Sequence, residues 1–222
     1  AQTHTSSVES LDMAIEAGID ILTHCGASGM TTPIPEETIK KMADHQIPCS
    51  ILPITQRRLD ALLEKDPDHY FVKFLKIMKV NHRNMIKGGV VLLMSTDAGI
   101  TNPVLAAEAE GRGAVQVDPR TKLGEGHFNA LKALQEMGMK PMEILKSATS
   151  NVAKAYKKEA DIGTLEKGKI ADLVILDKNP LENAENYRSI NMVIKDGKPV
   201  DLDSLPLAPI ISTLADNRSS RQ

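Results

Sequence analysis

Residues 90–100 read Val-Val-Leu-Leu-Met-Ser-Thr-Asp-Ala-Gly-Ile, an unbroken apolar run that passes directly into a polar tip centred on Asp97. A continuous apolar run predicts a strand that is buried on both faces, as in a parallel sheet. Asp97 then stands at the C-terminal end of that strand, where open α/β sheets and barrels keep their ligands. The alternative is that Asp97 caps the following loop.

Two histidines also end apolar runs. His24 closes Gly-Ile-Asp-Ile-Leu-Thr-His-Cys-Gly, and His4 closes the short run Ala-Gln-Thr-His-Thr at the beginning of the chain. Two imidazoles and a carboxylate form a metal-binding set, so His4, His24 and Asp97 are candidate ligands if the fold gathers successive strand ends. The alternative for each histidine is a hydrogen bond to a neighbouring carbonyl group.

Composition excludes several classes of protein. The chain has 222 residues, 41% of them hydrophobic, and a formal net charge of −2, which argues for a globular protein and against nucleic acid or an anionic membrane as a partner. No apolar run approaches the length of a membrane span. Cys25 and Cys49 lie beside predicted strands without a Cys-X-X-Cys spacing, so we expect reduced apolar fillers, with a disulfide as the alternative.

Strands and helices alternate along the first two thirds of the chain, which predicts βαβ units in an α/β fold. Later the pattern changes to short strands with turn signals, the strongest being Asp196-Gly197. We therefore expect domains at 1–158 and 159–209 and a tail at 210–222. The predicted helices follow Ser6-Ser7 and cover 35–45, parts of 55–87, 129–137 and 141–157; the predicted late strands are 162–168, 171–177 and 190–197.

Several motifs resemble the amidohydrolase superfamily of metal-dependent hydrolases, in particular its prolidase-like and imidazolonepropionase-like branches. Gln-Thr-His-Thr-Ser, Asp-Ile-Leu-Thr-His-Cys-Gly and Leu-Met-Ser-Thr-Asp-Ala-Gly resemble the ends of the family's fifth, sixth and eighth strands. Residues 146–153 and 162–174 resemble its last barrel helix and accessory β-sandwich. The resemblance implies the C-terminal half of a (β/α)8 TIM barrel, strands 5 to 8, with part of that sandwich.

The sequence departs from the family at its beginning. It contains no His-X-His pair, and the strand that carries a carboxylated lysine in many members would precede Ala1. A complete barrel takes about 250 residues. The resemblance therefore implies the latter portion of a longer protein, with the N-terminal half of the same protein as its partner. We also expect a homo-oligomer and a cytoplasmic location.

The resemblance also implies a chemistry. One or two divalent metal ions, zinc by expectation, would be held by His4, His24 and Asp97, and Asp97 would serve as general base and then general acid. The expected activity is hydrolysis of a C–N bond in an amide, a lactam or an Xaa-Pro dipeptide, a small-molecule substrate. The alternatives are a non-catalytic structural or interaction module and a mononuclear deaminase.

Weaker candidates surround this set. Residues 101–126 form a long predicted loop that would serve the site, and His127 follows it and could reach substrate or cap the next helix. Arg57, with Arg58, could hold a substrate carboxylate or form a solvated face, and Met30 could line the pocket. His45, His69 and His82 lie in charged helical stretches and are predicted to be solvated.

Overall fold

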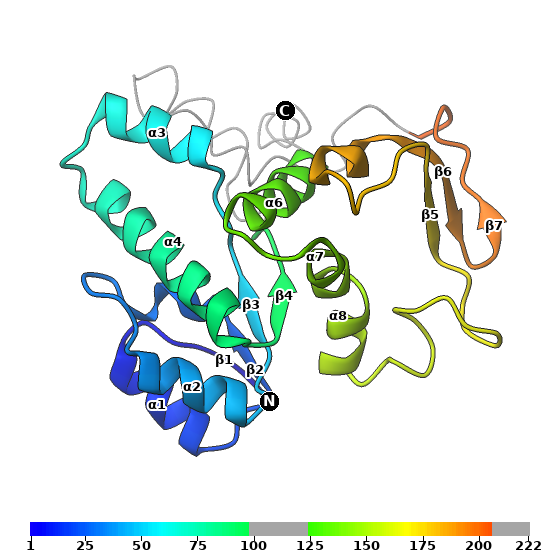
Figure 1. Ribbon diagram of the computed structural model, residues 1–222. Helices are drawn as coiled ribbons and strands as arrows, with labels where there is room; N and C mark the ends of the chain where they lie inside the picture. The colour runs from blue at the N-terminus through cyan, green and yellow to red at the C-terminus, as the bar shows by residue number, and fades with distance from the viewer. Residues whose placement is uncertain (98–123, 206–222) are drawn as a thin grey trace, which may run out of the picture.

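The chain forms an α/β structure around a parallel four-stranded sheet (Figure 1). The computed structural model describes residues 1–97 and 124–205. The strands lie side by side in chain order and every neighbouring pair is parallel, which confirms the predicted βαβ pattern. They are β1 (Gln2–His4), β2 (Ile21–Thr23), β3 (Cys49–Ile51) and β4 (Leu92–Met94).

The helices begin and end at the residues that local chemistry favours. Ser7 caps the first helix through a capping box with Ser10, and Gly89 ends α4 in a left-handed conformation at φ 76°. Among the described residues, no helix combines the length and apolarity that crossing a membrane requires. The helices are α1 (Val8–Glu16), α2 (Glu36–Asp44), α3 (Gln56–Lys65), α4 (Tyr70–Gly88), α6 (Glu125–Glu136), α7 (Pro141–Ser147) and α8 (Ser150–Ala155).

The two faces of the four-stranded sheet differ in polarity. Leu22, Cys49 and Leu92 are fully or nearly fully buried in one core with side chains of α1, α2, α4, α6 and α7. Because side chains alternate along a strand, the neighbouring positions belong to the opposite face. They include Thr23 and Ser50, which pair through the strand register with His4 and Leu93. The face away from the helices therefore carries the first candidate histidine with Thr23 and Ser50, beside the buried apolar Ile21 and Leu93.

Two predicted elements were wrong. Residues 162–168 contain turns and no strand, with Gly163 at φ 95° and Gly168 at φ 94°. The predicted helix 141–157 is two helices, α7 and α8, that separate at Ala148 and Thr149. Ser147 and Thr149 donate their hydroxyls to carbonyl oxygens one turn earlier, a local bond that competes with the regular helix pattern.

A second, antiparallel sheet follows, with β5 (Leu173–Leu176), β6 (Ile190–Lys195) and β7 (Lys198–Pro199). Asp196 and Gly197, at φ 50° and 76°, form the two-residue turn between β6 and β7, as the sequence predicted. Val174 and Ile175 on β5 remain 58% and 43% exposed, an unusual state for apolar strand residues.

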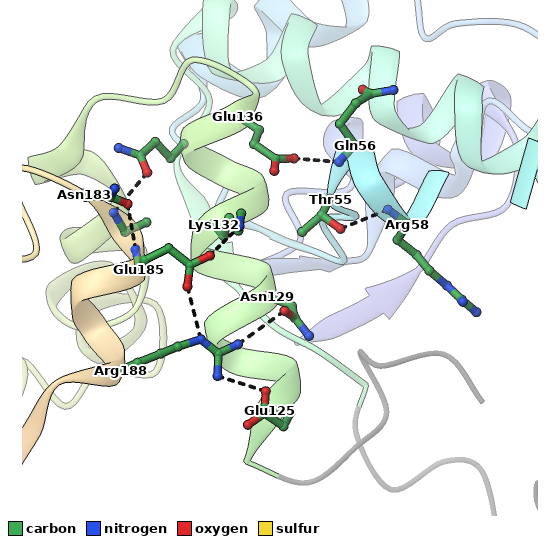
Figure 2. A network of polar contacts seen from close by, with 12 residues as sticks. Thr55, Gln56, Arg58, Glu125, Asn129, Lys132, Glu136, Asn183, Glu185 and Arg188 are labelled. Atoms are coloured by element: carbon green, nitrogen blue, oxygen red, sulfur yellow. Dashed lines mark hydrogen bonds and ion pairs between the residues drawn. The ribbon is translucent and has the colours of Figure 1, made fainter. Parts of the chain in front are cut away.

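A polar network joins α6 to the short helix Ala184–Arg188, which directly precedes β6 of the second sheet (Figure 2). Arg188 donates to Glu125 at 2.9 Å and lies over the Phe128 ring, 4.7 Å from its centroid. Lys132 pairs with Glu185 and holds the pKa of that carboxyl below its ordinary value, chiefly through their hydrogen bond. These contacts fix the start of β6 against α6, which packs on the four-stranded sheet.

Lys79 on α4 is a buried ammonium group and allows a test of the fold. Its side chain is 2% exposed, and Nζ donates to the Ile54 carbonyl at 3.2 Å. Burial lowers the pKa of Lys79 below its ordinary value, so the unfolded chain holds this proton to higher pH than the folded one. The free energy of unfolding should therefore rise as the pH increases from the pKa of Lys79 in the folded chain to its higher pKa in the unfolded chain.

We expect wild type to gain stability relative to Lys79→Met between pH 7 and pH 10, measured by urea unfolding. The same substitution at exposed Lys76, one turn earlier, is the control for placing methionine in this helix. A difference between wild type and Lys79→Met that stays constant with pH would contradict this assignment.

Candidate functional site

His4 and His24 meet at the carboxyl edge of the parallel sheet. His4 ends β1 and His24 directly follows β2, and the two strands are neighbours in register. Nδ1 of His4 lies 2.7 Å from Nε2 of His24, and the ring centroids are 4.5 Å apart. His4 is exposed and His24 half-buried, so the nitrogen pair is open to solvent. The structure thus brings together two candidate ligands that are 20 residues apart.

The backbone at His24 is unusual. His24 has φ 35° and ψ 44°, a left-handed conformation that side chains other than glycine adopt infrequently and that recurs at functional sites. Its N–H donates to Ser50 Oγ on β3 at 3.0 Å. The turn at His24 is therefore held by the next strand, and Ser50 is a contributor that the sequence analysis missed.

Asp97 lies at the same edge, beyond the end of β4. It also adopts a left-handed conformation, at φ 50°. The backbone leading to it is held by Ser95, whose N–H and hydroxyl both bond the Ile51 carbonyl, at 3.2 and 2.9 Å. Within 1–97 and 124–205, no three His, Cys, Asp or Glu side chains gather closely enough to hold a metal ion. The structure therefore pairs the histidines without placing Asp97 in a three-ligand cluster with them.

Cys25 and Cys49 form a disulfide, so the expectation of reduced cysteines was wrong. Both are fully buried, with Cα atoms 6.3 Å apart. Regular strand alternation would place Cys25 on the same face as Thr23, away from Cys49. The left-handed turn at His24 ends that alternation, and Cys25 enters the helix-covered core beside Cys49. The covalent bond joins the end of β2 to β3 one residue after His24.

His82 is fully buried, so its predicted solvation was wrong. It lies on α4 next to the equally buried Asn81, and both face the segment that follows His24. Gly26 and Gly29 are a sequence signal for this packing, because glycine permits close approach of the backbone to a neighbouring side chain. His45 and His69 are exposed, as predicted.

Within the described part of the chain, none of the weaker candidates forms a hydrogen bond or an ion pair with His4 or His24. His127 is exposed in the first turn of α6, whose N-cap is Gly124, so it does not cap that helix. Arg57 is exposed at the start of α3, and Met30 is 53% exposed after the short helix Cys25–Ser28. The predicted site loop at 101–126 lies largely outside the described residues, which resume at 124.

The sequence profile of the amidohydrolase family matches residues 2–200. The chain belongs to the amidohydrolase family. This confirms the resemblance seen in the strand-end motifs, and the match runs through both sheets of this amidohydrolase chain.

Known proteins similar to this amidohydrolase chain include hydrolases of several kinds. A molinate hydrolase structure is 38% identical with a TM-score of 0.82, covering 94% of this chain and 44% of its own. Phenylurea hydrolase B is 30% identical with a TM-score of 0.80, covering 95% and 45%. The imidazolonepropionase of Fusobacterium nucleatum is 27% identical over 188 residues, which is 82% of this chain and 37% of that protein. The chain thus spans less than half the length of these relatives.

Proposed function

We propose that this amidohydrolase chain forms the C-terminal half of a (β/α)8 barrel in a metal-dependent hydrolase that cleaves a carbonyl C–N bond. The observation that carries the proposal is the 2.7 Å approach of His4 and His24 at the carboxyl edge of parallel strands. The names of similar proteins, a phenylurea hydrolase and an imidazolonepropionase among them, support hydrolysis of a small organic substrate.

The histidine pair fits a divalent metal ion by the chemistry of its nitrogens, since imidazole nitrogens are preferred zinc ligands. Nδ1 of His4 and Nε2 of His24 share a hydrogen bond at 2.7 Å at neighbouring strand ends, and binding an ion would replace that bond with two metal–nitrogen bonds. A bound zinc-type ion supplies polarisation of a carbonyl group and lowers the pKa of a water toward neutrality. His4 and His24 would be the ligands from this chain, and further ligands would come from outside the described residues.

Asp97 is the proposed proton carrier. Its carboxylate would accept a proton from the attacking water and donate it to the leaving nitrogen of the C–N bond. Its place after β4, at the edge shared with the histidine pair, supports this role. The left-handed backbone at Asp97 fixes the direction of its side chain relative to the end of β4.

The sheet edges suggest the nature of the partner. Within the described residues, β1 pairs only with β2 and β4 only with β3, so each outer strand has one edge without a strand neighbour. The exposure of the apolar Val174 and Ile175 supports a further covering element on the second sheet. We propose that strands from the N-terminal half of the same protein pair with β1 and β4 and close the barrel, and that others cover the second sheet.

Zinc titration of the 222-residue chain by isothermal calorimetry tests the ligand assignment. We expect His4→Ala and His24→Ala each to weaken Zn²⁺ binding by at least about tenfold, because each removes a donor. His45→Ala is the matched control, since His45 is exposed at the end of α2. Equal Zn²⁺ affinity in all four proteins would reject the histidine pair as the metal site.

A further inference from the structure

The segment that follows His24 is held by one buried side chain of α4. Asn81 is fully buried, its Nδ2 donates to the Gly26 carbonyl at 2.8 Å, and its Oδ1 accepts the Ile34 N–H at 2.9 Å. One amide therefore joins the two ends of the segment 26–34, which otherwise lacks strand or α-helix hydrogen bonds along most of its length. We call residues 25–34 the His24 loop.

Two glycines let the His24 loop lie directly on α4. A Cβ added at Gly26 would stand 2.4 Å from Nε2 of the buried His82. A Cβ at Gly29 would stand 3.2 Å from Asn81 Nδ2 and 2.1 Å from the Thr32 carbonyl. Neither glycine has a positive φ, so the requirement for glycine here comes from space. The Asn81-His82 pair and the two glycines form one interlocking contact.

The His24 loop also contacts the end of β1. The hydroxyls of Ser28 and Thr5 lie 2.6 Å apart, and Ser28 Oγ donates to the Thr5 carbonyl at 3.2 Å. Both residues are buried, and Thr5 immediately follows His4. The loop therefore touches the chain next to both candidate ligands: it begins directly after His24 and bonds the residue after His4.

We propose that Asn81 is a positioning residue for the His4–His24 pair. Its two side-chain hydrogen bonds go to the His24 loop and to neither histidine. Those bonds set the loop on α4, and the loop sets the backbone beside both rings. As a metal-site role this inference rests on the proposed function of the pair as ligands, whereas the geometric effect on the two rings does not depend on it.

Two substitutions disrupt the contact between the His24 loop and α4, one in the helix and one in the loop. Asn81→Ala removes both hydrogen bonds and leaves the Gly26 carbonyl and Ile34 N–H without that partner. Gly26→Ala keeps Asn81 but places a methyl group against the buried His82 ring. Thr38→Val is the matched control, because Thr38 is 1% exposed and its hydroxyl bonds Asp12 of α1 instead of a residue of the His24 loop.

The metal-free readout is the ring ¹⁵N spectrum of the full chain labelled with ¹⁵N-histidine. In wild type, His4 Nδ1 and His24 Nε2 should show the shifts of a hydrogen-bonded pair. In Asn81→Ala and in Gly26→Ala these two resonances should move toward those of unpaired imidazoles, while the exposed His45 is unchanged. Thr38→Val should leave all of them as in wild type.

The second readout is Zn²⁺ affinity, which should fall about 10- to 100-fold in both loop variants and stay unchanged in Thr38→Val. Wild-type ring resonances and Zn²⁺ affinity in folded Asn81→Ala and Gly26→Ala would overturn the proposal. If Asn81→Ala does not fold, Gly26→Ala decides. If wild type itself binds no Zn²⁺, the proposed function fails, and the ring spectra alone decide whether Asn81 positions the pair.

Discussion

Asp97→Asn should lower the rate of C–N bond hydrolysis by roughly 10³-fold in the proposed full-length hydrolase, because positioned proton transfer contributes about 10²–10⁴-fold. Asparagine has nearly the same shape as aspartate and tolerates the left-handed backbone observed at this position. The substitution therefore removes the charge and the proton acceptor without disturbing the turn. If Asp97 had only a structural role, the hydrolysis rate should change little, because asparagine keeps the size of the side chain and one acceptor oxygen.

The measurement is initial rates over a substrate panel of N-acyl amino acids, lactams and phenylureas, with Asp68→Asn as the control. Asp68 is an exposed carboxylate two residues before α4, and its ion-pair partner is Lys73. Melting curves of both variants separate a loss of chemistry from a loss of fold. Hydrolysis by Asp97→Asn at the rate of wild type would remove Asp97 from the mechanism.

Loss of the Cys25–Cys49 disulfide should have the largest effect on stability. The bond closes a loop with a sequence separation of 24, and such a crosslink stabilises by about 3 kcal/mol in the chain-entropy model. For a chain of this size the melting temperature should fall by roughly 6–12 °C. We expect this shift in Cys25→Ala/Cys49→Ala by calorimetry, and a similar one for wild type in excess dithiothreitol.

The double variant provides its own control, because its melting temperature should not respond to dithiothreitol. Thiol alkylation of denatured, unreduced wild type should label neither cysteine, since none of the cysteines is free. Labelling of both cysteines in wild type, together with a wild-type melting temperature that does not change with dithiothreitol, would contradict the disulfide. Reduction should also loosen the His24 loop, which starts at Cys25.

The arrangement of the strands could be predicted because it depends on local patterns. Apolar runs that alternate with helical periodicity specify parallel strands, and parallel strands bring their carboxyl ends to one edge. That rule placed His4, His24 and Asp97 at one edge if the fold gathers successive strand ends. The two histidines meet there at 2.7 Å, whereas Asp97 forms no three-ligand cluster with them among the described residues. The Asp196-Gly197 turn was predictable for the same reason, since its two positive φ angles are a property of the dipeptide.

Other features were decided only by the tertiary structure. The disulfide depends on a left-handed turn at His24 that reverses the direction of Cys25, and no spacing rule contains that turn. His82 was predicted to be solvated because its neighbours in sequence are charged, yet the glycines of a distant loop bury it. The local sequence contains the apolar periodicity that identifies a helix or strand. The burial of a given side chain depends on which distant segment packs against it.

By itself, then, the sequence determined which residues end strands and therefore which side chains share the edge of the sheet. Only the tertiary structure decided how the His24 loop is anchored, through Asn81, the Thr5–Ser28 pair and the Cys25–Cys49 bond. The physical reason is distance along the chain. Strand and helix periods arise between residues a few positions apart, but these anchors join residues that are 23 to 55 positions apart and gain their energy only once the sheet has formed.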